Sequence, residues 1–143
     1  MRELEFRQRN NRYLFPVAIL RPTYSNDITA FSATALLDTG ATVSGIGPRV
    51  VAALELESHG KKRLRSATEE RFVAYYAFRV GFYTTEQVME PDRIDPALPF
   101  VFEDVDGFSW IGSADFDVII GIDILSQCEM RFDRSGRCLL KFG

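Results

Sequence analysis

An acidic residue follows an aliphatic run in this chain, in the sequence Asp38-Thr39-Gly40 preceded by Leu36 and Leu37. Two aliphatic residues before the acid are typical of a buried strand, and a carboxylate at the end of such a strand costs free energy unless chemistry needs it there. The chemistry that it offers is acid–base catalysis, in which a carboxylate takes a proton from water. Because Asp-Thr-Gly occurs once in the chain, a reaction that needs two such carboxyl groups must find the second elsewhere.

An ordinary turn is the other interpretation of the same three residues. Asp and Thr side chains can hydrogen-bond to nearby backbone groups, and Gly accepts backbone angles that other residues avoid. These residues alone do not decide between a turn and a reactive site.

Composition favours a single β-rich domain over residues 1–143. Of the 143 residues, 46% are hydrophobic and 13% are aromatic, including twelve Phe. A chain of this size can bury a core, and aromatic residues are common in strands.

Charge and hydropathy argue against nucleic-acid and membrane partners. The net charge is −3 and the isoelectric point is about 5.2. The one dense basic run, residues 61–65, is interpreted as a solvated strand or hairpin leg. The N-terminus is charged where a signal peptide is apolar, and no run has the length of a membrane span. We therefore expect a cytoplasmic protein.

The residues that could bind a metal or act as other nucleophiles lack partners. His59 is the only histidine and has no Cys or His nearby in the sequence, so we expect no metal and no cofactor. Ser44 and the two cysteines have no identifiable base. A turn centred on Arg134 and Ser135 would place Arg131 opposite Cys138, so we expect no disulfide to Cys128.

The elements that would position Asp38 are mostly strands. Alternation and β-type residues predict strands over 14–20, 28–37 and 42–46, with Pro16 indicating an edge position, and a helix from Pro48 to about Leu56. A long hairpin follows, with legs at 64–67 and 72–82 and a polar turn at 68–71, and even-numbered residues from Phe72 to Phe82 share one face.

The last third of the chain predicts a second informative strand. Residues 84–95 are interpreted as a loop, 98–102 as a strand and 103–107 as a turn. The apolar run Ile119-Ile120-Gly121 then ends a buried strand, and Asp123 is placed to cap a short helix. Residues 129–132 and 138–142 predict a closing hairpin that turns at Ser135 and Gly136.

These runs together resemble the retropepsin-like aspartic proteases, the single-domain relatives of pepsin found in retroviruses and in cellular and bacterial homologues. The resemblance rests on residues 36–42 and on Ile119-Ile120-Gly121 with the residues that follow, in that order and spacing. It favours the reactive interpretation of Asp38 over the turn. It implies an all-β, closed-barrel-like acid protease fold, with one or two short helices here, and an active site formed between two subunits.

The resemblance also implies roles for individual residues. Asp38 would be the catalytic residue, Thr39 would brace its loop in the dimer, and Gly40 would let backbone and substrate approach closely. The substrate would contact Ala41 and Gly121 beside that loop. At the tip of the hairpin, which would be the flap, it would contact Ala67, Thr68 and Glu69.

Two departures from the viral enzymes stand out in the sequence. The tip of the hairpin contains no glycine and two acids, and Ile122 replaces the Arg that many viral enzymes place after the second motif. We therefore carry two hypotheses: a homodimeric aspartic endopeptidase that cleaves polypeptides, and a catalytically silent module of the same fold that dimerises or binds peptides. In either case we expect the closing hairpin at 129–142 to form the dimer seam.

Overall fold

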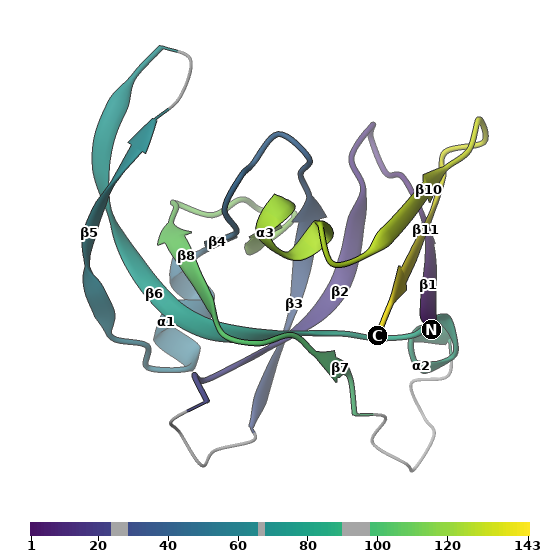
Figure 1. The fold of residues 1–143 in the computed structure, drawn as a ribbon, viewed down its shortest axis with the longest axis horizontal. Coiled ribbons are helices and arrows are strands. Elements are labelled where there is room, and N and C mark those ends of the chain that lie inside the picture. Colours follow the sequence, from purple (N-terminus) through teal and green to yellow (C-terminus); the bar gives the residue numbers. More distant parts are fainter. Residues whose placement is uncertain (24–28, 66–67, 90–97) are drawn as a thin grey trace.

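The structure, a computed structural model, describes residues 1–23, 29–65, 68–89 and 98–143. Its described strands form two sheets (Figure 1). The small sheet has the order β1 (Arg2–Arg7), β11 (Arg137–Phe142), β10 (Glu129–Phe132). The large sheet has the order β2 (Leu14–Leu20), β3 (Ala30–Leu37), β9 (Val118–Ile120), β4 (Gly45–Ile46), β8 (Val105–Ser109), β6 (Glu70–Phe82), β5 (Ser58–Arg65), and β7 (Phe100–Val101) pairs with β6.

The large sheet closes on itself. Strand β2 pairs with β3 along its whole length and with β6 from Val17 to Leu20. The ring β2-β3-β9-β4-β8-β6 is therefore complete, which confirms the closed-barrel-like prediction. Pro16 lies just before the pairing with β6 begins, where β2 is still an edge strand. The backbone N–H that proline lacks is therefore not needed for pairing with β6.

Aromatic rings join the two sheets in the core. Phe82 makes edge-to-face contacts with Phe15 at 5.2 Å, Phe102 at 4.7 Å and Phe142 at 5.4 Å between ring centroids. Because Phe142 belongs to the small sheet, its burial holds that sheet against the barrel.

The described residues include three short helices, where one or two were predicted: α1 (Pro48–Ala53), α2 (Thr85–Met89) and α3 (Ile122–Leu125). Helix α2 corrects the prediction of a loop over 84–95, of which 90–95 lie outside the described residues. The Thr84 N–H donates to Gln87 at 2.7 Å, and the Gln87 N–H donates to the Thr84 hydroxyl at 3.3 Å. This reciprocal capping starts a helix that the polar composition conceals.

Other boundaries differ from the prediction. Strand β8 begins at Val105, inside the predicted turn, because Val105 and Gly107 are buried while Asp106 is exposed. Strand β4 contains only Gly45 and Ile46. Helix α1 ends at Ala53, earlier than the predicted end near Leu56. Leu54 is its C-terminal capping residue, and Glu55 after it has a left-handed φ of 50°. Strand β1 was not predicted, and it pairs with β11 so that the termini lie side by side.

The hairpin between β10 and β11 is as predicted, except for its register. Phe132, not Arg131, lies opposite Cys138, because the turn is centred on Ser135 itself and not between Arg134 and Ser135. Cys128 and Cys138 are free thiols.

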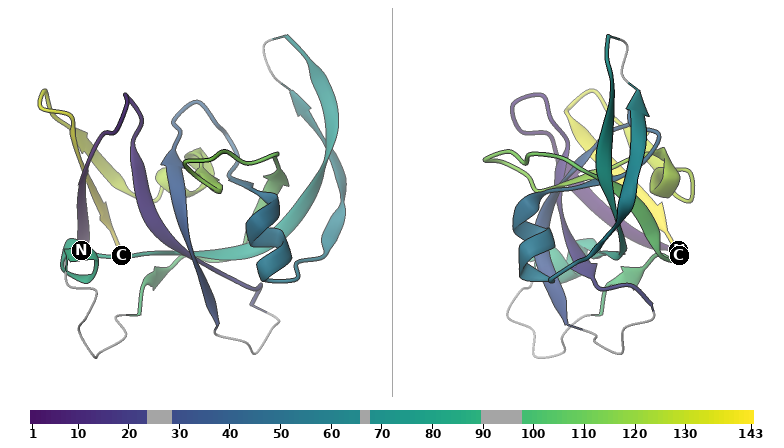
Figure 2. Two further views of the ribbon diagram at one scale, coloured as in Figure 1. Left: turned by 180° about the vertical axis from the view of Figure 1, so that it is seen from behind. Right: turned by 90° about the vertical axis from the view of Figure 1, so that its left-hand side faces the viewer.

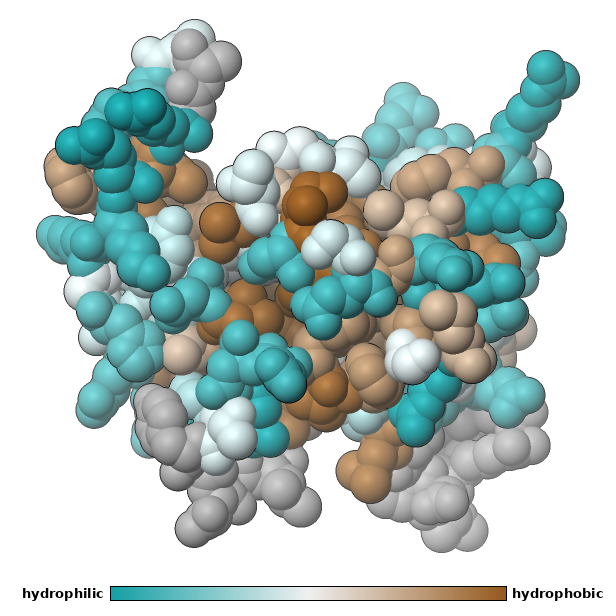
Figure 3. Space-filling view, in the orientation of Figure 1, coloured by the Kyte–Doolittle hydropathy of each residue, from teal (hydrophilic) through white to brown (hydrophobic). Residues whose placement is uncertain are grey.

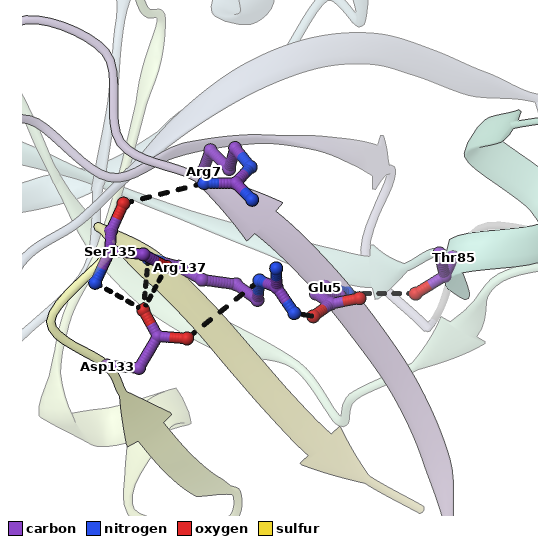
Figure 4. Close-up of polar contacts among 6 residues, drawn as sticks. All are labelled: Glu5, Arg7, Thr85, Asp133, Ser135 and Arg137. Atoms are coloured by element: carbon purple, nitrogen blue, oxygen red, sulfur yellow. Dashed lines mark hydrogen bonds and ion pairs between the residues drawn. The ribbon is translucent and has the colours of Figure 1, made fainter.

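A polar cluster fixes the turn of this hairpin (Figure 4). One carboxylate oxygen of Asp133 accepts hydrogen bonds from the Ser135 hydroxyl at 2.7 Å, the Ser135 N–H at 2.9 Å and the Arg137 N–H at 3.1 Å. These contacts, the hydroxyl first among them, hold the pKa of Asp133 below its usual range. The Arg137 guanidinium also pairs with Glu5 on β1 at 3.0 Å, so the cluster joins all three strands.

Candidate active site

The topology brings the two sequence motifs together. Strand β9 pairs in parallel with β3, with Leu37 opposite Ile120, and antiparallel with β4, with Ile119 opposite Gly45. Strand β9 therefore lies between two strands that the segment 38–44 connects. Because of this insertion, the segment that carries Asp38 must cross the end of β9.

Asp38 belongs to a turn and also stands at this junction. Its N–H donates to the carbonyl of Ile120 at 3.0 Å, and the Ala41 N–H donates to the Asp38 carbonyl at 3.2 Å. The Gly40 N–H donates to one oxygen of the Asp38 carboxylate at 2.9 Å. Asp38 is half-buried, while Thr39 and Gly40 are exposed. Both interpretations of these residues thus describe the same loop, since the turn is what orients the carboxylate.

Gly121 lies against the loop and leaves no room for a side chain. A Cβ at this position would stand 2.7 Å from the Ala41 carbonyl oxygen and 2.9 Å from the Val43 carbonyl carbon. The Ile122 N–H donates to that same Ala41 carbonyl at 2.8 Å. The two predicted contact residues Ala41 and Gly121 are therefore neighbours, and both support the position of the loop.

The capping role predicted for Asp123 is confirmed in part: one of its carboxylate oxygens accepts from the Ile124 N–H in the first turn of α3 at 3.0 Å, although Asp123 lies within the helix. Gly121 precedes α3, and the carboxylate of Asp123 also accepts from the Ser44 N–H at 3.0 Å and the Ser44 hydroxyl at 2.7 Å. The Ser44 hydroxyl in turn accepts from the Gly121 N–H at 3.0 Å. Ser44 is fully buried, so these bonds join the far end of the loop to α3.

From the sequence, Ser44 was considered only as a nucleophile, and it was set aside because no base was identifiable for it. The signal that could have found it is weak: a serine at the end of the Asp38 loop and an acid two residues after Gly121 become partners only once β9 is placed between β3 and β4.

The hairpin of β5 and β6 rises at the same end of the molecule as segment 38–44 (Figures 1 and 2). Thr68 and Glu69 are exposed at its tip, which stands away from the loop, and Ala67 lies outside the described residues. The structure thus joins Ala41 and Gly121 to the Asp38 loop, whereas no described hydrogen bond or ion pair joins Thr68 or Glu69 to it.

Other reactive groups do not compete with Asp38 in the described part of the chain. Burial raises the pKa of Cys128 and of Cys138 to about 11, so both thiols stay protonated near neutral pH. No group of three or more His, Cys, Asp or Glu side chains there could hold a metal ion. No helix in the described ranges is both long and apolar enough to cross a membrane.

The fold matches that of a solved structure. A crystal structure of a retropepsin-like aspartic protease from Rickettsia conorii superposes with a TM-score of 0.62, over 98% of this chain and 91% of that chain, at 16% sequence identity. The chain has the retropepsin fold. No family model and no curated protein matches the sequence. In this retropepsin fold the Asp38 loop, β9 and α3 form one connected unit, and its chemistry depends on the residues present here.

Proposed function

We propose that the chain is an aspartic endopeptidase that acts as a homodimer, with one Asp38 from each subunit. The observation that carries the proposal is the position of Asp38. In a retropepsin fold, its carboxylate stands in a turn held by the Gly40 N–H, and the loop is fixed to β9 and α3.

A two-fold dimer supplies the carboxyl group that one chain lacks, because an isologous contact brings the same residue twice. Two negative charges about 4 Å apart repel by roughly 4 kcal/mol at an effective dielectric constant of about 20. The pair therefore keeps one proton. The unprotonated carboxylate takes a proton from water, whose oxygen attacks the peptide carbonyl carbon, and the protonated partner donates a hydrogen bond to the carbonyl oxygen. The carboxyl group that took the proton from water then gives it to the leaving nitrogen as the C–N bond breaks, which returns the pair to its starting state with one proton.

The remaining roles follow the same arrangement. Thr39, exposed beside Asp38, braces the loop across the dimer, and the exposed Gly40 admits the substrate backbone. The hairpin serves as the flap, whose tip residues 67–69 contact the substrate, as do Ala41 and Gly121 beside the Asp38 loop. We place the dimer seam at the closing hairpin, since β10 is the outer strand of the small sheet and Phe132 on it is 46% exposed.

Substitution of the catalytic group tests the proposal. We expect Asp38→Asn to abolish hydrolysis of a denatured protein substrate, because the amide cannot accept a proton from water, and to leave the fold intact. Hydrolysis is measured from acidic to neutral pH with and without pepstatin, and the fold by circular dichroism. A fully active Asp38→Asn protein would overturn the assignment.

A peptide-binding or dimerising module without turnover is the second candidate. It is favoured by the acids and the lack of glycine at the turn between β5 and β6. Absence of cleavage at every pH, together with retained peptide binding, would select this candidate.

A further inference from the structure

The hairpin carries a charge opposite to that of the rest of the chain. Residues 58–72 contain five basic residues, Lys61, Lys62, Arg63, Arg65 and Arg71, and two acidic ones, Glu69 and Glu70, a net charge of +3. Since the whole chain carries −3, the remainder carries −6. Figure 3 shows hydrophilic residues along the hairpin. A partner with negative charge is therefore attracted to this element and repelled by the rest.

The basic residues outnumber the carboxylates available to them. Arg63 and Arg65 share Glu70, Arg71 lies 4.0 Å from Glu69, and Lys62 lies 3.2 Å from Asp106 on β8. All these side chains are more than 40% exposed. Exposed pairs of this kind contribute about 0 to 1 kcal/mol, so a carboxylate from a partner can replace them at little cost.

Strand β5 offers a backbone edge as well as charge. It is the last strand of the large sheet and, among the described residues, pairs with β6 alone. Its side chains alternate so that Lys61, Arg63 and Arg65 share one face. An open edge of this type binds an extended polypeptide as an added strand. Two copies of β5 would repel each other, so the edge discriminates against its own copy.

An exposed aromatic ring lies on the same hairpin face. Phe72 lies opposite Arg63 in the hairpin and is 66% exposed. The Arg63 guanidinium lies 6.0 Å from the centroid of the Phe72 ring. Alternation places Phe72 on the side of β6 that carries Phe78 into the core. An apolar side chain of a bound strand could pack against the Phe72 ring.

We infer that the β5 edge binds an acidic segment of polypeptide in an extended conformation. A nucleic acid is the disfavoured polyanion, because it has no strand backbone to pair with β5 and a long one would also meet the negative remainder of the chain. That the bound segment belongs to the substrate rests on the proposed function, whereas the binding itself does not.

The test measures binding to the full chain carrying Asp38→Asn, so turnover plays no part. The probes are a fluorescent peptide of alternating Glu and Val, its Lys–Val counterpart, and single-stranded DNA of equal charge. We expect the Glu–Val peptide to bind most tightly, and to weaken as salt rises from about 0.05 M to about 0.5 M. Adding Lys61→Glu and Arg65→Glu should weaken its binding by about tenfold or more.

The matched control adds Arg9→Glu and Arg12→Glu, the same charge change at two exposed residues outside β5 and the closing hairpin, and should weaken binding less than about threefold. Circular dichroism confirms that each protein is folded. Equal binding of the Lys–Val peptide, retained binding in Lys61→Glu/Arg65→Glu, an equal loss in the control, or tighter binding of DNA would each overturn the inference. Absence of cleavage by the native chain would overturn only the proposed function.

Discussion

At the scale of single residues, Ser44 carries more of the site's order than its type suggests. One hydroxyl accepts from the Gly121 N–H and donates to Asp123, and the Ser44 N–H donates to the same carboxylate. The loop that holds Asp38 is thus fixed at both ends, to Ile120 at its start and to α3 at its end. Because Ser44 is fully buried, water cannot replace these bonds if the hydroxyl is lost.

Ser44→Ala should therefore lower the free energy of unfolding. Removal of the hydroxyl leaves the Gly121 N–H and one Asp123 oxygen without this partner, at a cost of roughly 1 to 3 kcal/mol. Urea unfolding followed by circular dichroism measures the change. Ser126→Ala, at an exposed serine after α3, serves as the control and should change stability by less than about 0.5 kcal/mol. Equal stability of the two variants would refute the structural role of the Ser44 hydroxyl.

Two glycines of the site differ in what an added methyl group would meet. At Gly121 the nearest atom is a backbone carbonyl oxygen at 2.7 Å, whereas at Gly40 it is the Asp38 carboxylate oxygen at 3.2 Å, which can rotate away. We expect Gly121→Ala to destabilise the protein by roughly 1 to 3 kcal/mol through overpacking. Gly40→Ala should cost less than about 1 kcal/mol. Thermal unfolding compares the pair, and a larger loss for Gly40→Ala would contradict the packing argument.

At the scale of elements, the sequence predicted those whose pattern is local. Strand β2 has the predicted bounds because an apolar run ends at a polar loop, and the closing hairpin is marked by Ser135 and Gly136. Strand β1 was missed because its charged residues do not indicate pairing with β11. Helix α2 was missed because its polar residues were interpreted as a loop, although Thr84 and Gln87 cap its start. The sequence predicted the contact of Asp123 with α3 but missed its bonds to Ser44, because Ser44 is distant in sequence.

The turn of the closing hairpin makes a prediction about pH. Hydrogen bonds from Ser135 and Arg137 lower the pKa of Asp133 relative to the unfolded chain, whose Asp residues have a pKa of about 3.9. This contribution to stability is fully present above that value and disappears as the pH falls through the folded-state pKa. The Asp133→Asn protein should therefore lose less stability than the native chain when the pH falls below about 4. Urea midpoints at pH 7 and pH 3 measure it, and an unchanged difference between them would refute the prediction.

At the scale of the whole molecule, the proposed chemistry requires that two chains assemble into a dimer. One chain presents one Asp38, so an isolated subunit should be inactive and specific activity should rise with protein concentration. The fold superposes on a retropepsin-like protease over nearly its full length. Under the proposed function, the second carboxyl group would come from the other subunit of a dimer. Mixing subunits that differ only in the side chain of residue 38 therefore probes the contact between subunits directly.

Mixing native chains with Asp38→Asn chains should reduce activity more steeply than dilution does. Random pairing of equal amounts leaves about one quarter of the dimers with two native subunits, and mixed dimers lack one acid–base group. At constant total concentration, after time for exchange, we therefore expect about one quarter of the native rate. Subunits that act alone would retain about one half, because each native chain would work independently of its neighbours. An equal mixture of native and Arg9→Glu chains controls for mixing itself, since Arg9 is exposed and the change leaves the Asp38 pair intact. A rate that falls only in proportion to the native fraction would therefore show that the carboxyl pair is not shared between subunits.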